Sequence, residues 1–146
     1  MARPVPALPP FHVPRPRVLD LLDAGAETPL TAVIAPPGAG KSVSLAEWIR
    51  ERCPSAVWVP CDERDGDPVV FLGHIALALH AVQGDRWLDA VELLRERDPH
   101  PEVAVDTILS ELEDEAAVLV LDDVHVAREA RSFLSRLVNI CRRVRA

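Results

Sequence analysis

Apolar residues along the chain fall into short continuous runs and into stripes at helical spacing. The continuous runs predict three buried strands, at residues 30–34, 56–60 and 116–121. Apolar residues at every third or fourth position predict helices over about residues 18–22, 42–52, 68–82, 86–95, 101–113 and 128–143. Because strands alternate with helices, we expect an α/β domain built around a parallel sheet.

The helical stripes also predict which side chains face the core. They are Leu19, Leu22, Leu45, Trp48, Ile49, Phe71, Leu72, Ile75, Leu79, Val82, Trp87, Leu88, Val91, Leu94, Val105, Ile108, Leu109 and Leu112. Asp67 followed by Pro68 is typical of a helix N-cap and a first helical residue. Residues 23–29 contain a glycine and are expected to form a turn before the first strand.

A glycine-rich turn and a helix follow the first apolar run, which is the order of elements in a phosphate-binding loop, or Walker A motif. Glycines let the backbone N–H groups form a nest for phosphate oxygens, and the helix N-terminus adds its positive dipole end. Lys41 would reach the β- and γ-phosphates, and the Ser42 hydroxyl would ligate Mg²⁺. The predicted binding residues are Gly38, Ala39, Gly40, Lys41, Ser42 and Val43.

Two details of this loop affect the interpretation. Ala35 stands at the first position, where the general motif has glycine, but Pro36 and Pro37 precede the amides of the nest, so their missing N–H groups need not cost a phosphate contact. The chain has 16 basic residues, and Lys41 is its only lysine. A compact ammonium on a flexible stem therefore occurs only where a P-loop requires one.

The third apolar run ends in two carboxylates, which is the pattern of a Walker B segment. Asp122 at the strand end would hold Mg²⁺, directly or through water, and Asp123 would polarise the attacking water. Alone, the two acids could equally cap the following helix. A P-loop about 80 residues upstream on another parallel strand favours the functional interpretation.

Composition limits the class of protein. At 146 residues the chain is one domain or part of one, and a net charge of −7 argues against a general nucleic-acid surface. Cys53, Cys61 and Cys141 show no paired or metal-type spacing, which suggests free thiols in a reducing cytoplasm. We expect no signal peptide and no membrane span.

Four ordered motifs resemble the STAND-type P-loop ATPases, in particular the large ATP-binding transcriptional regulators of the LuxR family and the related maltose-regulon activators. The family's Pro-Arg-Pro-Arg-hydrophobic-Leu opening is similar to residues 14–19, and its Leu-Ala-Glu-Trp helix segment to residues 45–48. Its second-strand motif is met by Trp58, Asp62, Asp65, Asp67, Pro68 and Phe71. Its apolar-Asp-Asp-x-His segment is met by residues 121–125, and the Ala-Pro start of its loop accounts for Ala35. The departures, Pro37, Ala39, Cys61 and Gly66, lie in loops.

The resemblance implies a three-layer P-loop NTPase domain of the ASCE type, with a Pro-rich arm at residues 1–16 and the N-terminal part of the ATPase domain at 17–146. It implies ATP and Mg²⁺ as ligands, slow hydrolysis as a nucleotide switch, and Arg17 near the adenine base. Self-association and DNA binding would belong to a full-length relative. We expect no direct nucleic-acid binding by this chain.

The family's strand order, 5-1-4-3-2, implies that this chain supplies strands one to three only. We therefore expect an incomplete sheet, in which residues 30–34 and 118–121 either pair directly or leave a slot between them. We also expect this chain by itself to be poorly soluble or loosely folded, to bind ATP weakly and to hydrolyse it negligibly, which the next 30 or so residues would correct.

Three alternatives stay open. A small-molecule kinase shares the P-loop but needs an acceptor site and an Arg-rich lid. A dinucleotide-binding domain would use Gly38, Gly40 and Asp62, but it gives Lys41 and Ser42 no role. The third alternative is a truncated, non-catalytic nucleotide-binding or interaction fragment.

Overall fold

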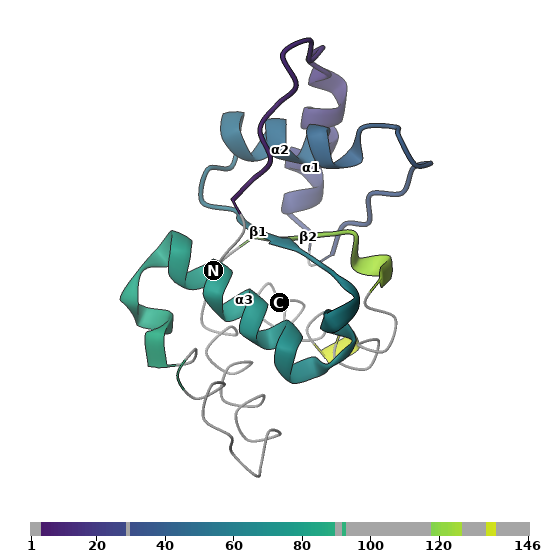
Figure 1. Ribbon diagram of the computed structural model, residues 1–146. Helices are drawn as coiled ribbons and strands as arrows, with labels where there is room; N and C mark the ends of the chain where they lie inside the picture. Colours follow the sequence, from purple (N-terminus) through teal and green to yellow (C-terminus); the bar gives the residue numbers. More distant parts are fainter. Residues whose placement is uncertain (1–3, 29, 90–91, 93–117, 127–133, 137–146) are drawn as a thin grey trace.

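The computed structural model describes residues 4–28, 30–89, 92, 118–126 and 134–136. Figure 1 shows helices α1 (Pro16–Ala26) and α2 (Lys41–Glu51) above two strands, and helix α3 (Pro68–Gln83) below them. The strands are β1 (Val57–Pro60) and β2 (Leu119–Asp122). Three short 3-10 helices complete the elements, η1 (Glu63–Gly66), η2 (Asp85–Trp87) and η3 (Val124–Val126). The predicted α/β class is confirmed.

The two strands pair in parallel, from Val57 opposite Leu119 to Pro60 opposite Asp122. The ladder extends past both ends of β1, because the Val57 N–H donates to the Val118 carbonyl at 2.8 Å and the Cys61 N–H to the Asp122 carbonyl at 2.9 Å. The carboxyl ends of both strands therefore lie side by side. Parallel strands of this kind are normally covered on both faces.

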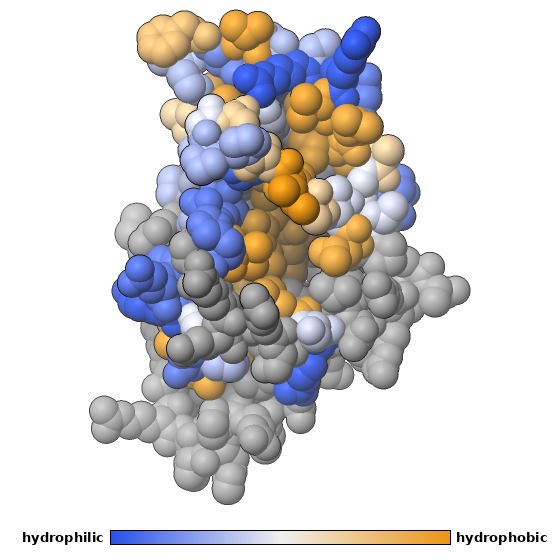
Figure 2. All heavy atoms as spheres, turned by 90° about the vertical axis from the view of Figure 1, so that its right-hand side faces the viewer, coloured by the Kyte–Doolittle hydropathy of each residue, from blue (hydrophilic) through white to orange (hydrophobic). Residues whose placement is uncertain are grey.

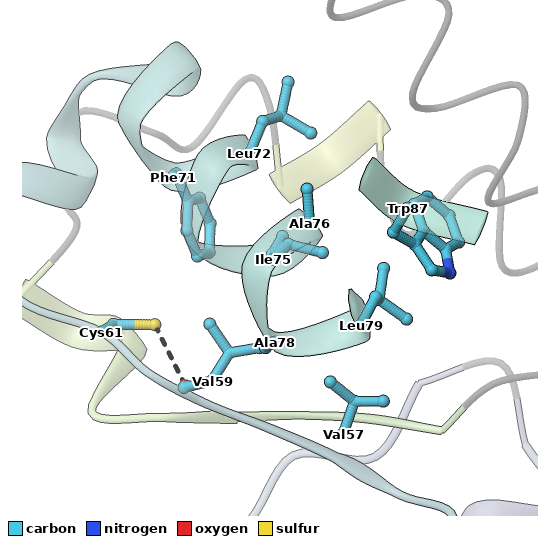
Figure 3. Packing of buried hydrophobic residues seen from close by; sticks show 10 residues of the cluster. All are labelled: Val57, Val59, Cys61, Phe71, Leu72, Ile75, Ala76, Ala78, Leu79 and Trp87. Carbon is cyan, nitrogen blue, oxygen red and sulfur yellow. Dashed lines mark hydrogen bonds between the residues drawn. The ribbon is translucent and has the colours of Figure 1, made fainter. Parts of the chain in front are cut away.

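Alternate residues of β1 enter two different apolar clusters, because successive side chains of a strand point to opposite faces. Val57 and Val59 pack with the buried face of α3 and with Trp87, as Figure 3 shows. The Trp87 indole is fully buried, and its N–H donates to Gln83 Oε1 at 2.7 Å. This lower cluster contains Val57, Val59, Cys61, Phe71, Leu72, Ile75, Ala76, Ala78, Leu79 and Trp87.

The upper cluster joins the sheet to α1 and α2, and contains Leu19, Leu22, Trp48, Ile49, Ala56, Trp58 and Val120. Polar contacts at its edge connect the two helices. The Trp48 indole N–H donates to Asp23 Oδ1 at 2.8 Å, and Arg52 donates to the other oxygen of Asp23 at 2.7 Å. The Asp23 carboxylate is thus held by the buried Trp48 ring on one oxygen and by the exposed Arg52 side chain on the other.

The prediction of a strand at residues 30–34 is wrong for this structure. The segment pairs with neither described strand, and Ile34 is 90% exposed. Its first residues are engaged elsewhere, since the Thr31 hydroxyl donates to the Gly25 carbonyl at 2.8 Å and the Thr28 hydroxyl to the same oxygen at 2.7 Å. Side-chain bonds to backbone compete with sheet pairing.

Figure 2 shows apolar side chains, in orange, gathered on one face of the molecule.

Most other local predictions within the described residues are confirmed. Asp67 caps α3, accepting from the N–H groups of Val69 at 2.8 Å and Val70 at 3.3 Å. The expected turn at 23–29 is shorter, because α1 continues to Ala26. Val82 and Leu88, expected in the core, are exposed. The expected helix at 101–113 lies outside the described residues, as do half of the helix expected at 86–95 and most of the helix expected at 128–143. None of the described helices is long and apolar enough to span a bilayer.

Truncating Leu72 should destabilise the domain much more than truncating Val82 on the same helix. Leu72 is fully buried, whereas Val82 is 48% exposed. We expect Leu72→Ala to lower the free energy of unfolding by about 2–5 kcal/mol, and Val82→Ala to change it by less than about 1 kcal/mol. Urea denaturation followed by far-UV circular dichroism measures both values. Equal losses would contradict the packing of the lower cluster.

Candidate functional site

The predicted phosphate-binding segment forms a tight turn followed directly by α2. The Ala39 N–H donates to the Pro36 carbonyl at 3.2 Å, and Gly38 has a φ of 79°. Proline at the second position and a positive φ at the third are typical of a type II turn. Gly40, with φ 82° and ψ 28°, is the N-cap of α2. Both glycines thus stand where a side chain would strain the backbone.

The first turn of α2 begins without a side-chain cap. Its opening residues, Lys41, Ser42 and Val43, are all partly buried. The first N–H groups of a helix have no partner within the helix, and together with the helix dipole they favour an anion. The local backbone therefore has the features that the sequence predicts for a phosphate site.

The Lys41 side chain folds back over the loop. Its ammonium donates to the Ala35 carbonyl at 2.9 Å and to the Pro36 carbonyl at 3.3 Å. Both acceptors lie at the start of the same loop, so the cation is held beside the turn. An ammonium has three donors on a flexible stem and can exchange such carbonyls for other oxygen acceptors.

A side-chain hydrogen bond joins the two predicted motifs. The Ser42 hydroxyl donates to Asp122 Oδ1 at 3.0 Å, across 80 positions of sequence, and both residues are partly buried. Ser42 is the second residue of α2, and Asp122 is the last residue of β2. The structure thus brings together the two residues that the sequence predicts as Mg²⁺ ligands.

Asp123 follows β2 and turns away from the strand direction. Its φ is 55°, and it is the only described residue other than glycine with a positive φ. Its side chain is exposed, with Oδ1 3.9 Å from His125 Nδ1. The carboxylate is therefore open to solvent next to Asp122.

Asp62 and Asp65, which the sequence placed in the second-strand motif, contact each other at the end of β1, and sequence reasoning missed this contact. Asp62 and Asp65 form a capping box around η1: the Asp62 N–H donates to Asp65 Oδ2 at 2.6 Å, and the Arg64 N–H to Asp62 Oδ1 at 2.9 Å. Asp65 is fully buried, and its Oδ1 lies 2.6 Å from His74 Nδ1 on α3. The signal was the spacing of three between the two acids, which suits a reciprocal cap.

Two pKa shifts report the electrostatics of this edge. Hydrogen bonds from the Arg64 side chain and backbone lower the pKa of Asp62 well below its usual range. Burial, reinforced by Asp65, Asp122, Asp123 and Asp62, raises the pKa of the Cys61 thiol to about 12. The carboxyl edge of the sheet therefore carries negative potential that would attract a cation.

The N-terminal arm brings an arginine to the loop, but it is Arg15. Arg15 Nη1 donates to the Ala39 carbonyl at 2.9 Å. Arg17, predicted near the base, is exposed on α1, and its role stays a prediction. The Pro-Arg-Pro-Arg stretch at residues 14–17 contained both arginines without indicating which one faces the loop.

These features agree with the comparison to known families. The model of the AAA domain family matches residues 26–145, which include the loop, Ser42 and Asp122. The chain belongs to the AAA domain family. Membership in this family implies the P-loop NTPase fold, and the resemblance to the ATPase part of MalT-like regulators is confirmed.

Curated relatives are much longer than this chain. The chain is similar to "HTH-type transcriptional regulator MalT" of Vibrio cholerae, to which it is 29% identical over 79% of this chain and 13% of the relative's length. "Serine/threonine-protein kinase PknK" of Mycobacterium tuberculosis is 30% identical over 82% of this chain and 11% of its own. MalT of Vibrio campbellii is 30% identical over 77% and 13%. The chain thus spans about an eighth of these relatives. No solved structure matches it.

The buried thiol in the AAA domain should be far less reactive than Cys53, which is partly exposed. With a pKa of about 12, the Cys61 thiol is ionised in only about one molecule in 10,000 at pH 8. We expect iodoacetamide at pH 8 to alkylate Cys53 first and Cys61 only in denaturant, as peptide mass spectrometry measures. Equal rates in the native protein would contradict this.

The sign of the pH effect on stability follows from the same shift. The folded pKa of about 12 lies above the reference of 9.0, so the unfolded state loses this proton first. The contribution of Cys61 to the free energy of unfolding is therefore complete below pH 9 and falls as the pH rises toward 12.

Proposed function

We propose that this AAA domain binds ATP with Mg²⁺ on the loop at residues 35–43 and hydrolyses it slowly as a nucleotide switch. The observation that carries the proposal is the 3.0 Å hydrogen bond from Ser42 to Asp122. In P-loop ATPases a hydroxyl at the helix start and a carboxylate at a strand end serve the same metal ion. Two glycines at positive φ and an uncapped helix N-terminus lie beside that bond.

The donor atoms suit Mg²⁺. They are a hydroxyl and a carboxylate oxygen, and within the described residues no group of three or more His, Cys, Asp and Glu side chains could hold a metal by itself. Mg²⁺ usually takes one or two protein oxygens, and water and substrate phosphates supply the rest. When bound, the ion would supply charge neutralisation to the phosphates.

The chain's own groups would do the remaining work. The loop amides and the start of α2 would orient the phosphates, and Lys41 would exchange its carbonyl partners Ala35 and Pro36 for phosphate oxygens. The exposed Asp123 carboxylate would orient a water molecule and accept its proton.

The relatives support a switch rather than a complete activity. One is named as a transcriptional regulator and the other as a protein kinase, yet both match this same segment. What they share here is therefore a common module, and we propose that it is nucleotide binding coupled to a change of state. DNA binding and self-association are assigned to longer proteins, and a cytoplasmic location remains a prediction.

Titration with labelled ATP tests the proposal directly. We expect saturable binding that strengthens when Mg²⁺ is added, because the metal joins Ser42 and Asp122 to the phosphates. Asp122→Asn should retain binding without Mg²⁺ but lose the gain that Mg²⁺ provides. Absence of saturable binding in the folded protein would contradict the proposal.

The two motifs should divide their work in a measurable way. Lys41→Ala should weaken ATP binding by about 1.5–3 kcal/mol, because it removes a charge-assisted phosphate contact. Asp123→Asn keeps the Asp122 carboxylate, so binding should persist while turnover falls. Asparagine also tolerates a positive φ, so the substitution changes charge with little backbone strain. Equal losses of affinity in both variants would refute these roles.

A further inference from the structure

The side chain that approaches the phosphate loop from outside belongs to Arg15. Besides donating to the Ala39 carbonyl at 2.9 Å, its guanidinium lies 3.5 to 3.8 Å from the position that a Cβ atom would occupy on Gly40. The guanidinium thus lies against the peptide bond between Ala39 and Gly40. This peptide stands between the type II turn and the first residue of α2.

Arg15 is held in place on its C-terminal side by α1. It is the N-cap residue of that helix, with Pro16 in the first turn, and its carbonyl accepts from the N–H groups of Val18 at 2.8 Å and Leu19 at 3.2 Å. Leu19 is buried against the upper cluster. The backbone of Arg15 is therefore fixed by a helix that packs on α2.

The arm before Arg15 is fastened to the other end of α2. Arg50 donates to the carbonyls of Pro6 and, at 3.1 Å, of Val5. His12 Nε2 lies 3.0 Å from Oε2 of Glu47, whose side chain is fully buried. The arm thus contacts α2 through the Val5 and Pro6 carbonyls and through the His12 side chain. Figure 1 shows the arm, in dark purple, passing α2.

The planarity of the peptide bond turns this contact into a constraint on the nest. In a trans peptide the C=O and the following N–H point in opposite directions. A guanidinium that holds the Ala39 carbonyl therefore directs the Gly40 N–H away from itself. Gly40 needs such a constraint, because a glycine visits many backbone conformations when nothing restricts it.

We propose that Arg15 is a positioning residue of the nucleotide site, which locks the Ala39–Gly40 peptide so that the Gly40 N–H stays in the phosphate nest. The inference rests on the proposed function and adds that an arm outside the loop sets its affinity. Arg15 acts on the loop and makes no contact with the nucleotide. Loss of the arm contact would free the peptide to rotate.

Fluorescence titration with N-methylanthraniloyl ATP and ADP, both with Mg²⁺, tests the effect on affinity. Arg15→Ala should lower the affinity for both nucleotides by the same factor, about tenfold. The reason is that one charge-assisted bond preorganises a nest that both nucleotides use. The affinity of Arg15→Lys, which offers a single ammonium, should lie between that of Arg15→Ala and that of the wild type. Arg52→Ala is the matched control, because Arg52 is also an exposed arginine but stands at the opposite end of α2 from the loop, and its affinity should stay within about twofold of the wild type.

Amide hydrogen exchange without nucleotide separates positioning from direct contact. If Arg15 positions the loop, the Gly40 and Lys41 amides should exchange faster in Arg15→Ala than in wild type or Arg52→Ala. Unchanged exchange, or a loss of affinity for ATP alone, would instead identify a direct phosphate contact and overturn the inference. Unchanged affinity in Arg15→Ala would overturn it as well.

Two controls keep the result interpretable. Thermal melting without nucleotide shows whether each variant folds, and if Arg15→Ala does not, the comparison of Arg15→Lys with wild type decides in the same way. Lys41→Ala reports on the proposed function itself. If wild type binds ATP and Lys41→Ala lowers the ATP affinity while the Arg15 variants do not, only the positioning role of Arg15 fails. If wild type binds no nucleotide, the proposed function fails with it.

Discussion

The parallel pairing of β1 with β2 is the constraint on which the site depends. Residues 61–118 separate the two strands in sequence, yet the register places Pro60 opposite Asp122. The segments that leave both strands, η1 on one side and Asp123 on the other, consequently emerge at the same edge. Ser42 then joins α2 to this edge through its bond to Asp122. A change of register by one residue would turn Asp122 to the opposite face of the sheet.

Charge is distributed unequally across this edge. On the strand side, burial and then the negative charge of four nearby carboxylates raise the pKa of the Cys61 thiol. On the loop side lie Lys41, the start of α2 and the Arg15 guanidinium. A ligand that carries negative phosphates together with a divalent cation would match both halves at once. An apolar or uncharged ligand would leave both the negative strand side and the positive loop side without a partner.

Much of the fold could be predicted because burial leaves a periodic pattern in sequence. The stripe on α3 correctly gave Phe71, Leu72, Ile75 and Leu79 as core residues. Val82 continues the same stripe but is exposed, since a helix of 16 residues is about 24 Å long and a strand of four only about 13 Å. Periodicity reports which face is apolar, and the extent of the partner decides how much of it is covered.

Other features depended on tertiary placement. Residues 30–34 have the composition of a strand, but a strand exists only with a partner, and side-chain bonds to Gly25 hold the start of the segment. Arg15 is the non-helical N-cap of α1 and donates to the Ala39 carbonyl, whereas Arg17 is exposed on the helix itself. The sequence motif contained the right chemistry and could not choose between them. The predicted pair Ser42 and Asp122 needed no such choice, because Ser42 stands at the start of α2 and Asp122 at the end of β2.

The left-handed backbone at Asp123 limits which residues can stand there. Among the twenty amino acids, glycine, asparagine and aspartate accept a φ of 55° most readily, and of these only aspartate carries a negative charge. A chain that keeps a carboxylate at this position therefore accepts a conformational cost that glycine would avoid. Strain retained at one exposed residue, beside a strand end, is typical of positions selected for activity rather than for stability. Evolution toward a more stable domain would be expected to replace this aspartate early, and to lose the proposed hydrolysis before it lost the fold.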